Sequence, residues 1–187
     1  MDTVQDQRFK GEDFTRGLEA AEYDGCSFTQ CIFSEADLSR ITFMDCDFDG
    51  CDLSNVKMAD VALREVRFKN CKLMGIHFDA CNDFLFDVSF ENCLLNFSSF
   101  YKKSLKKTRL AHCSLHEVDL VEADMSESLF DECDFAGATF DRTNLDKSDM
   151  TTSFNFMIDP ENNKLKKTKF SKESLAGLLG KYDIVIK

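Results

Sequence analysis

The sequence predicts an all-β fold in which the chain winds as a β-helix, a solenoid of short parallel strands. Two observations predict it: a large apolar residue recurs every five residues, and a small or medium residue stands two positions before it. A period of five matches neither the 3.6-residue period of an amphipathic helix nor the two-residue period of a half-buried strand. Each five-residue unit therefore forms one side of a four-sided coil, and about 20 residues complete a turn.

We call each large apolar residue a centre. Centres recur without interruption from Tyr23 to Phe78 and again from Leu85 to Met150. The step from Phe78 to Leu85 is seven residues instead of five, which indicates an insertion of two residues. Phe9 and Phe14 are earlier units, one residue out of phase with Tyr23, so we expect irregular backbone near residues 15–22.

All nine cysteines occupy the small position of this repeat. Allowing for the insertion, six are spaced to stack on one inner face: Cys31, Cys51, Cys71, Cys93, Cys113 and Cys133. Stacked strands lie about 4.8 Å apart, whereas a disulfide prefers Cβ atoms about 3.8 Å apart. The pairs Cys26/Cys31 and Cys46/Cys51 lack the closer spacing and the histidines typical of zinc sites. We therefore expect buried thiols that pack as small apolar groups, with no metal.

One set of inward positions breaks the apolar rule. On successive coils it reads Ala21, Ile41, Val61, Asp83, Lys103, Ala123 and Thr143. Burial of either charge alone is costly. The interpretation we favour is that the chain bulges outward at Asp83 and at Lys103, and the alternative is a local ion pair between them. In either case, loops are expected to leave the solenoid at residues 79–87 and 101–107.

The C-terminal segment has a different pattern. The repeat is expected to stop after Met150, which divides the chain into a β-helix at 1–157 and a capping or dimerisation segment at 158–187. Residues 158–163 read as a turn, Ser171 is suited to begin a short helix that ends at Gly180, and residues 182–186 read as a strand. The segment's apolar residues are expected to close the last coil, pair two subunits, or do both: Leu175, Leu178, Leu179, Tyr182, Ile184, Val185 and Ile186.

The net charge of −11 is unevenly distributed. Residues 1–60 carry 14 acidic and 5 basic side chains and residues 116–150 carry 11 and 2, whereas residues 101–115 carry five basic and no acidic ones. The acidic residues around the centres are candidate partner-binding groups: Asp37, Asp45, Asp47, Asp49, Asp52, Asp119, Glu122, Asp124, Asp131, Glu132, Asp134 and Asp149. A candidate loop and basic contact comprises Asp83, Lys102, Lys103, Lys106, Lys107 and Arg109. Direct nucleic-acid binding is disfavoured, because it requires basic groups against phosphates.

The sequence predicts a protein that is not an enzyme and needs no cofactor. It contains no phosphate-binding glycine loop, nucleophile elbow or paired metal motif. His112 precedes Cys113, but Cys113 is expected to face the packed interior. No apolar run is long enough for a membrane span, and the first ten residues lack a signal-peptide core. We therefore expect one cytoplasmic domain without membrane contact.

The repeat resembles that of the pentapeptide repeat family, whose pattern is Ala/Cys-Asp/Asn-Leu/Phe-x-x. Residues 36–40 (ADLSR) and 123–127 (ADMSE) match it closely, and the resemblance covers residues 9–150. It implies a right-handed quadrilateral β-helix. Within the family, the chain is similar to the topoisomerase-protecting branch, which includes the Qnr quinolone-resistance proteins, MfpA, and the albicidin and microcin B17 immunity proteins. The points of similarity are the interruption near 79–87, residues 66–75 and the tail from Ile158.

This resemblance implies a non-catalytic DNA mimic. Its acidic rows would dock on the DNA-binding surface of DNA gyrase or topoisomerase IV, and either inhibit the enzyme or protect it from quinolones or toxins. The family also implies a homodimer through the C-terminal segment. The chain departs from the topoisomerase-protecting branch in three respects: Lys103 stands at an inward position, the expected loops are short, and a basic cluster splits the acidic surface. The alternative is a generic protein-interaction scaffold that uses the loops or the basic cluster.

Overall fold

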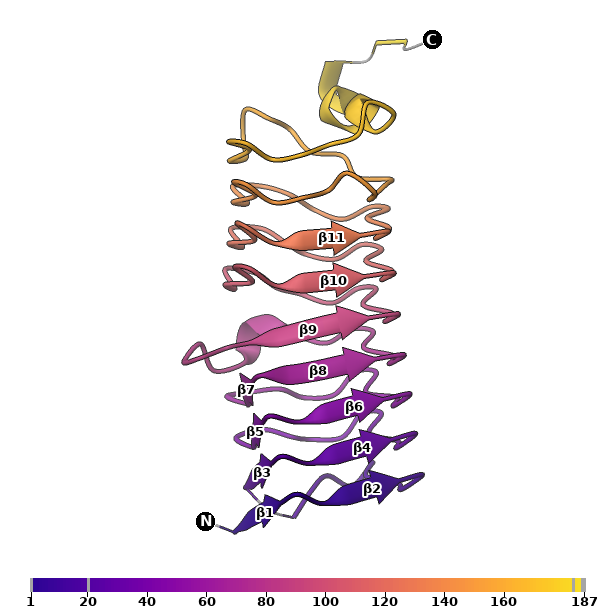
Figure 1. Ribbon diagram of the computed structural model, residues 1–187, viewed down its shortest axis with the longest axis vertical. Coiled ribbons are helices and arrows are strands. Elements are labelled where there is room, and N and C mark those ends of the chain that lie inside the picture. Colours follow the sequence, from indigo (N-terminus) through magenta and orange to yellow (C-terminus); the bar gives the residue numbers. More distant parts are fainter. Residues whose placement is uncertain (1, 20, 183, 186–187) are drawn as a thin grey trace.

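The computed structural model describes residues 2–19, 21–182 and 184–185. The chain forms one upright coil, with the N-terminus at one end of the rod and the C-terminus at the other (Figure 1). All strand pairs among the described residues are parallel. This is the arrangement that results when successive turns of a single coil lie on one another. The predicted all-β solenoid is confirmed.

Two faces of the coil carry regular strands. On the first face, four strands pair in the order β1 (Thr3–Gln5), β3 (Glu22–Asp24), β5 (Thr42–Met44) and β7 (Ala62–Arg64). On the second face, seven strands follow one another: β2 (Arg8–Lys10), β4 (Ser27–Thr29), β6 (Asp47–Asp49), β8 (Val66–Lys69), β9 (Val88–Glu91), β10 (Arg109–Ala111) and β11 (Leu129–Asp131).

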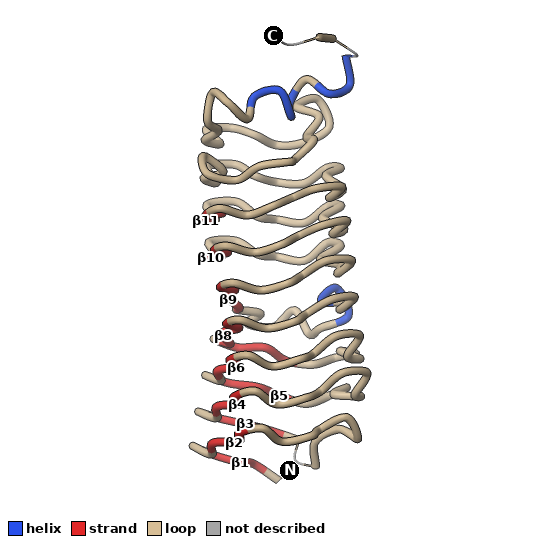
Figure 2. Tube along the Cα trace, turned by 90° about the vertical axis from the view of Figure 1, so that its right-hand side faces the viewer, coloured by secondary structure: helices blue, strands red, loops and turns tan. Residues whose placement is uncertain are grey.

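The other two faces are joined by single β-bridges, and Figure 2 shows them mostly as loop. The third face, which carries the cysteines, is bridged through Ile32, Asp52, Lys72, Leu94, Ser114, Asp134 and Phe154. The fourth face is bridged through Asp37 to Lys57 and through His77, Ser99, Asp119 and Thr139. One short helix, η1 (Phe78–Ala80), directly follows the bridged residue His77 and comes immediately before the insertion.

The strand pairing shows an irregular coil length at both places where one was expected, near the N-terminus and at the insertion. Thr3 pairs with Glu22, which in turn pairs with Thr42, so the first coil is one residue shorter than the second. Val66 pairs with Val88, and the coil between them accommodates the two inserted residues. Val4 lies opposite Tyr23 and is an earlier centre that the sequence pattern did not reveal.

Most corners of the coil are turned by a residue with positive φ. Gln30, Glu35 and Arg40 have φ of 53°, 62° and 66°, and most corner residues are not glycine. This left-handed conformation is unfavourable for residues with a Cβ. It persists because most corner amides bond to the next coil: Gln30 N–H donates to Asp49 C=O at 2.8 Å and Glu35 N–H to Ser54 C=O at 2.9 Å.

The centres form one continuous core along the rod. Phe28, Phe33 and Phe78 are fully buried. Aromatic rings on the second face stack from coil to coil, with centroid separations of 4.7 Å for Phe28 and Phe48 and 5.1 Å for Phe48 and Phe68. One expected centre is wrong: Leu85 is 63% exposed, and Phe86 packs against the core in its place. The inserted residues shift the inward position by one.

The nine cysteines are buried free thiols. The six-residue ladder is in register, because the residue after each cysteine bridges to its counterpart on the next coil. Most of the thiols donate to a carbonyl group of the neighbouring coil, as Cys51 Sγ does to Phe28 C=O at 3.2 Å. Burial raises the pKa of Cys46 and of Cys81 to about 12. These cysteines are therefore part of the scaffold.

The coil continues beyond residue 157, where the sequence led us to expect the cap to begin. Asn144 bridges to Lys164 and Asp149 to Lys169. Leu165 and Phe170, which follow these bridged lysines, pack against the core. The repeat therefore does not stop at Met150. The pattern was obscured because Phe156 and Ile158, which are buried, do not keep the five-residue spacing.

Two 3₁₀ turns, η2 (Leu175–Leu178) and η3 (Gly180–Tyr182), close this end. Ser171 Oγ accepts a bond from Ser174 N–H at 3.1 Å, immediately before η2. Leu178 packs against the core, whereas Leu175 and Leu179 are largely exposed. Gly180 begins the second turn instead of ending the helix. The strand expected at 182–186 is absent from its described part: Tyr182 lies in η3, and Ile184 and Val185 are exposed and irregular. Ile186 lies outside the described residues.

An ion-pair cluster attaches the cap to the coil. Lys181 Nζ lies 2.7 Å from Asp159 Oδ1 and 2.7 Å from Glu161 Oε2. The bond from Lys181 holds the pKa of Asp159 below its ordinary value of 3.8. Because folding lowers this pKa, the contribution of the ion pair to stability is fully present above pH 3.8. It is lost as the pH falls through the pKa that Asp159 has in the folded protein.

We therefore expect residues 175–182 to exchange their amide hydrogens faster below about pH 4, relative to the coil, after correction for intrinsic exchange. The Lys181→Ala variant should show fast exchange at neutral pH and little further acid dependence. Equal acid sensitivity in both proteins would contradict this role for the cluster.

Candidate partner-binding surface

The acidic candidates lie on all four faces of the coil. Asp47 and Asp149 are on the second face, Asp52 and Asp134 on the third, Asp37 and Asp119 on the fourth, and Asp124 on the first. No face among the described residues carries an uninterrupted column of carboxylates. Along the second face, for example, Asp47 is followed by Arg67 and then Ser89. This alternation of acidic, basic and neutral residues avoids the repulsion between like charges on adjacent strands.

The lower acidic group is centred on β6. Asp45, Asp47 and Asp49 are all exposed around this strand. Arg67, one coil further on, lies 2.8 Å from Asp45 and 2.5 Å from Asp47, and these bonds raise its pKa. Asn70 donates to Asp49 at 2.8 Å. The group therefore keeps a net negative charge, with three carboxylates and one guanidinium.

The upper acidic group lies around residues 131–134. His112 Nδ1 is 3.1 Å from Glu132, and His116 Nε2 is 2.8 Å from Asp134. These four side chains flank a groove of about 740 Å³. Asp149, further along the rod, accepts bonds from Thr151, which lower its pKa, and pairs with Lys169 at 2.9 Å.

The basic cluster of residues 102–109 contacts acids of the next coil. Lys102 lies 3.7 Å from Glu122, Lys106 3.6 Å from Glu127, and Arg109 4.0 Å from Asp131. Lys107 is exposed at a corner with φ of 62°. These contacts offset most of the cluster's charge. The chain at 101–107 follows the regular coil, so the loop expected there is wrong.

Lys103 is the exception in this cluster, because it is buried. Its side chain is 2% exposed, and its Nζ donates to Cys81 C=O at 2.6 Å and to Asp83 Oδ1 at 2.7 Å. The ion pair that we regarded as the alternative is therefore present, and the outward bulge at Lys103 is wrong. Asp83 does leave the coil, with its side chain 88% exposed. Cys81, 5% exposed, takes the inward position expected for Asp83.

A short loop at residues 82–87, the insertion loop, projects from the first face. Its tip is apolar, with Phe84 65% and Leu85 63% exposed. Its base is fixed by Lys103, whose Nζ also lies 4.9 Å from the centre of the Phe86 ring. The guanidinium of Arg64, on the preceding coil, lies 5.3 Å from the Phe84 ring. The insertion loop thus exposes an apolar tip, and the side chains of Lys103 and Arg64 contact it.

Comparison with known proteins identifies the family. The model of the pentapeptide repeat region matches residues 21–82, and that of eight-copy pentapeptide repeats matches residues 113–151. Together these two segments make up more than half of the chain. The chain is a pentapeptide repeat protein. Its fold is the right-handed quadrilateral β-helix that the repeat implied.

Two solved structures are similar to this pentapeptide repeat protein along nearly its whole length. Full-length QnrB1, a plasmid-mediated fluoroquinolone resistance protein, is 19% identical with a TM-score of 0.57, over 98% of this chain and 100% of QnrB1. A trypsin-treated variant of QnrB1 is 22% identical with a TM-score of 0.50, over 100% of both chains. At these identities the likeness establishes the fold alone. No curated protein sequence matches this chain.

Sequence reasoning missed the apolar tip of the insertion loop in this pentapeptide repeat protein. Leu85 was assigned to the core and Phe84 was not singled out. The available signal was the run Phe84-Leu85-Phe86, which offers three apolar residues where the repeat requires one. Arg64 was also missed, although its partner Phe84 lies on the insertion.

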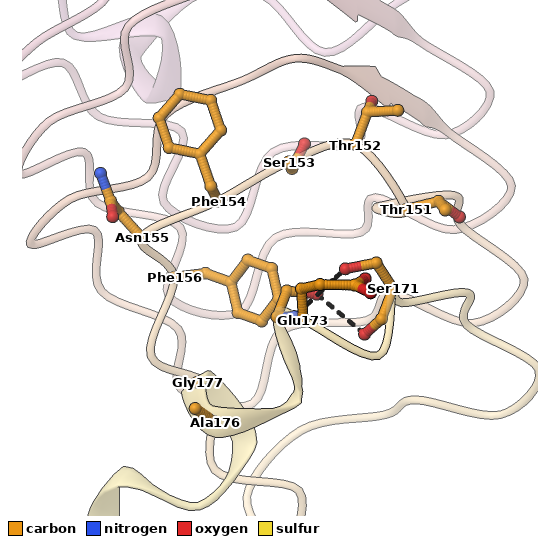
Figure 3. Close-up of a pocket in the computed structure, with 11 residues that line it drawn as sticks. Thr151, Thr152, Ser153, Phe154, Asn155, Phe156, Ser171, Glu173, Ala176 and Gly177 are labelled. Carbon is orange, nitrogen blue, oxygen red and sulfur yellow. Dashed lines mark hydrogen bonds between the residues drawn. The ribbon is translucent and has the colours of Figure 1, made fainter. Parts of the chain in front are cut away.

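Two hollows of this pentapeptide repeat protein lie among the residues discussed above. Figure 3 shows the hollow of about 420 Å³ between residues 151–156 and η2, where Glu173 is the single ionisable residue in the lining. In the groove beside His112 and His116, Cys113 is 2% exposed and faces the core. Across the described residues, no three or more His, Cys, Asp or Glu side chains are grouped to hold a metal ion. No described helix has the length and apolarity needed to cross a bilayer.

Proposed function

We propose that this protein is a non-catalytic DNA mimic that binds a type II topoisomerase, DNA gyrase or topoisomerase IV, in the cytoplasm. The observation that carries the proposal is a narrow rod with carboxylates distributed over all four of its faces. A duplex likewise presents negative charge all around its axis. A DNA-binding surface of Lys and Arg attracts such a rod through the same long-range field.

The resemblance to QnrB1 supports the choice of enzyme. QnrB1 is a fluoroquinolone resistance protein, and this chain matches it over its full length. Binding would either inhibit the topoisomerase or displace a quinolone or toxin from its complex with DNA. The acids around β6 and those at residues 131–134 are the contacts we assign to the enzyme, since they keep net negative charge after internal pairing.

The test is a titration of purified protein into gyrase supercoiling and quinolone-trapped cleavage assays. We expect a change in at least one of them, and an effect that weakens as salt rises. The Asp45→Asn/Asp47→Asn/Asp49→Asn variant should require about tenfold more protein, because three exposed charges are removed from the contact.

The matched control is Phe84→Ser/Leu85→Ser, which alters the insertion loop and leaves the acids intact. It should retain the activity if the acidic surface makes the contact. Wild-type protein that changes neither supercoiling nor cleavage, with either topoisomerase, would refute the proposal.

A second candidate function is a protein-interaction scaffold of another kind. The exposed tip of the insertion loop favours it, because exposed aromatic residues on a rigid base are typical of binding anchors. Under this alternative, the loop variant loses a partner in a lysate pull-down while the acid variant retains it. The presence of topoisomerase subunits in the pull-down distinguishes the two functions.

We also propose that the C-terminal segment joins two subunits. Leu175, Leu179, Tyr182, Ile184 and Val185 are all exposed at the closed end, which leaves an apolar surface beyond what the cap itself buries. A twofold dimer is the commonest oligomer. Val185→Asp would place a charge in this contact.

A further inference from the structure

The N-terminal end of the solenoid is left open by the described chain. β1 and β2 are the outermost strands of their sheets, and Figures 1 and 2 show no described element below them. At the other end, η2 covers the last coil, where Ile158 N–H donates to Gly177 C=O at 2.9 Å. Solenoids need a polar cap at each end to remain soluble. In the part of the chain that the structure describes, η2 and η3 cover the C-terminal coil, and nothing covers the N-terminal coil.

Apolar side chains line this open end. Val4, Phe9, Phe14 and Leu18 are half-buried around a hollow of about 520 Å³. Phe9 stacks on Phe28 at 4.9 Å and Phe14 on a ring of the next coil at 5.0 Å. Each of these rings therefore has one side against the core and the other towards the opening. A surface of this kind is usually covered by another molecule.

Backbone groups also point out of the open end. Ile32 N–H donates to Glu12 C=O and Phe14 N–H to Ile32 C=O, so the N–H and C=O of Asp13, between them, point away from the coil. Lys10 is aligned with Thr29 in the β2–β4 ladder and has the same orientation. An edge of this type pairs readily with another strand.

Charges of both signs surround the opening and form no ion pair with one another among the described residues. Arg8, Lys10, Glu12 and Asp13 are exposed, and no ion pair within 4 Å among the described residues involves residues 2–19. The bases lie on β2 and the acids follow at once on the third face. Gly11 turns the corner between them, and a side chain there would meet nothing within 4 Å.

We propose that a second copy of this chain covers the open end, joined end to end about a twofold axis that passes beside Gly11. Such an axis reverses the chain direction and lays β2 of one copy along residues 12–15 of the other. Lys10 then faces Asp13 of the second copy, twice. The two apolar openings close on each other, and the free edges pair antiparallel.

Charge complementarity identifies a second copy as the occupant. A rim that carries bases on one side of a corner and acids on the other is complementary to itself under this rotation. An axis through Phe9, the middle of β2, would instead set Lys10 against Arg8 of the second copy and bring like charges together. The contact is distinct from the C-terminal one and does not depend on the topoisomerase proposal.

The test is sedimentation equilibrium in the Val185→Asp background, so that the C-terminal segment does not contribute. We expect a monomer–dimer equilibrium. Lys10→Glu should weaken it about tenfold or more, because two like-charge contacts replace two attractive ones. Asp13→Asn should also weaken it, while its amide oxygen retains the bond that Asp13 Oδ1 accepts from Thr15 N–H at 2.9 Å.

Two further variants decide the assignment. The swap Lys10→Asp/Asp13→Lys should restore association to near the parent value. Lys57→Glu, an exposed charge reversal on the fourth face two coils away, should have no effect. A parent protein that stays monomeric at every concentration, or equal effects of Lys10→Glu and Lys57→Glu, would overturn the proposal.

Discussion

Replacement of Phe48 by alanine is expected to destabilise the fold by about 3–5 kcal/mol, the range for a buried aromatic residue in a packed core. Phe48 is 2% exposed and lies between Phe28, at 4.7 Å, and Phe68, at 5.1 Å. Its removal interrupts the stack at the centre of the second face. Strand spacing fixes the neighbouring coils, so they cannot close the cavity. Urea denaturation followed by circular dichroism measures the loss.

Phe9→Ala is the matched control for this prediction. Phe9 belongs to the same column, but it is half-buried and has a stacking partner on one side only. Its loss should cost roughly half as much or less, since part of its surface already faces solvent. Similar losses for Phe9→Ala and Phe48→Ala would show that position in the stack is unimportant.

Lys103→Ala is expected to destabilise the protein by about 2–4 kcal/mol and to release the insertion loop. The substitution removes a buried side chain, leaving a cavity, and takes the donor from Cys81 C=O, which becomes an unpaired buried acceptor. Phe86 also loses the cation above its ring. Denaturation measures the first effect, and the rate of chymotrypsin cleavage after Phe84 measures the second.

Lys103→Met separates the two effects. It retains most of the volume, and replacement of a buried ion by an apolar group is often close to neutral, so the stability should fall by less than about 1.5 kcal/mol. The loop should still be cleaved faster, because its anchoring bonds are gone. Asp83→Asn should change stability by under about 1 kcal/mol, since Asp83 is 88% exposed. A larger effect at Asp83 than at Lys103→Ala would contradict this assignment of roles.

The repeat predicted the core because burial follows sequence position directly in a solenoid. Each inward position stacks on the residue one coil away, so the cysteine ladder and the column of Phe28, Phe48 and Phe68 could be located by spacing. The prediction failed where spacing was ambiguous. Around the insertion, either Leu85 or Phe86 could occupy the one inward position. The five-residue spacing does not specify that Phe86 packs against the core and Leu85 is exposed.

The acidic surface could be predicted in composition and not in arrangement. The twelve candidate acids were named from the sequence, but their pairing with Arg67, Lys102, Arg109 and the two histidines depends on contacts between coils. Most of these partners are about one coil apart. The proposed topoisomerase contact therefore concerns the charge left after internal pairing.

The sequence by itself determined the solenoid, its four sides, its buried thiols and the place of its interruption, because a strict period fixes which residues point inward. Tertiary structure alone decided that Lys103 is buried, that Asp83 meets it from outside, and that the coil runs on to Lys169. These outcomes depend on contacts between successive coils, which lie far apart in the chain. The energy of a buried charge depends on the groups around it, and a local pattern does not specify them.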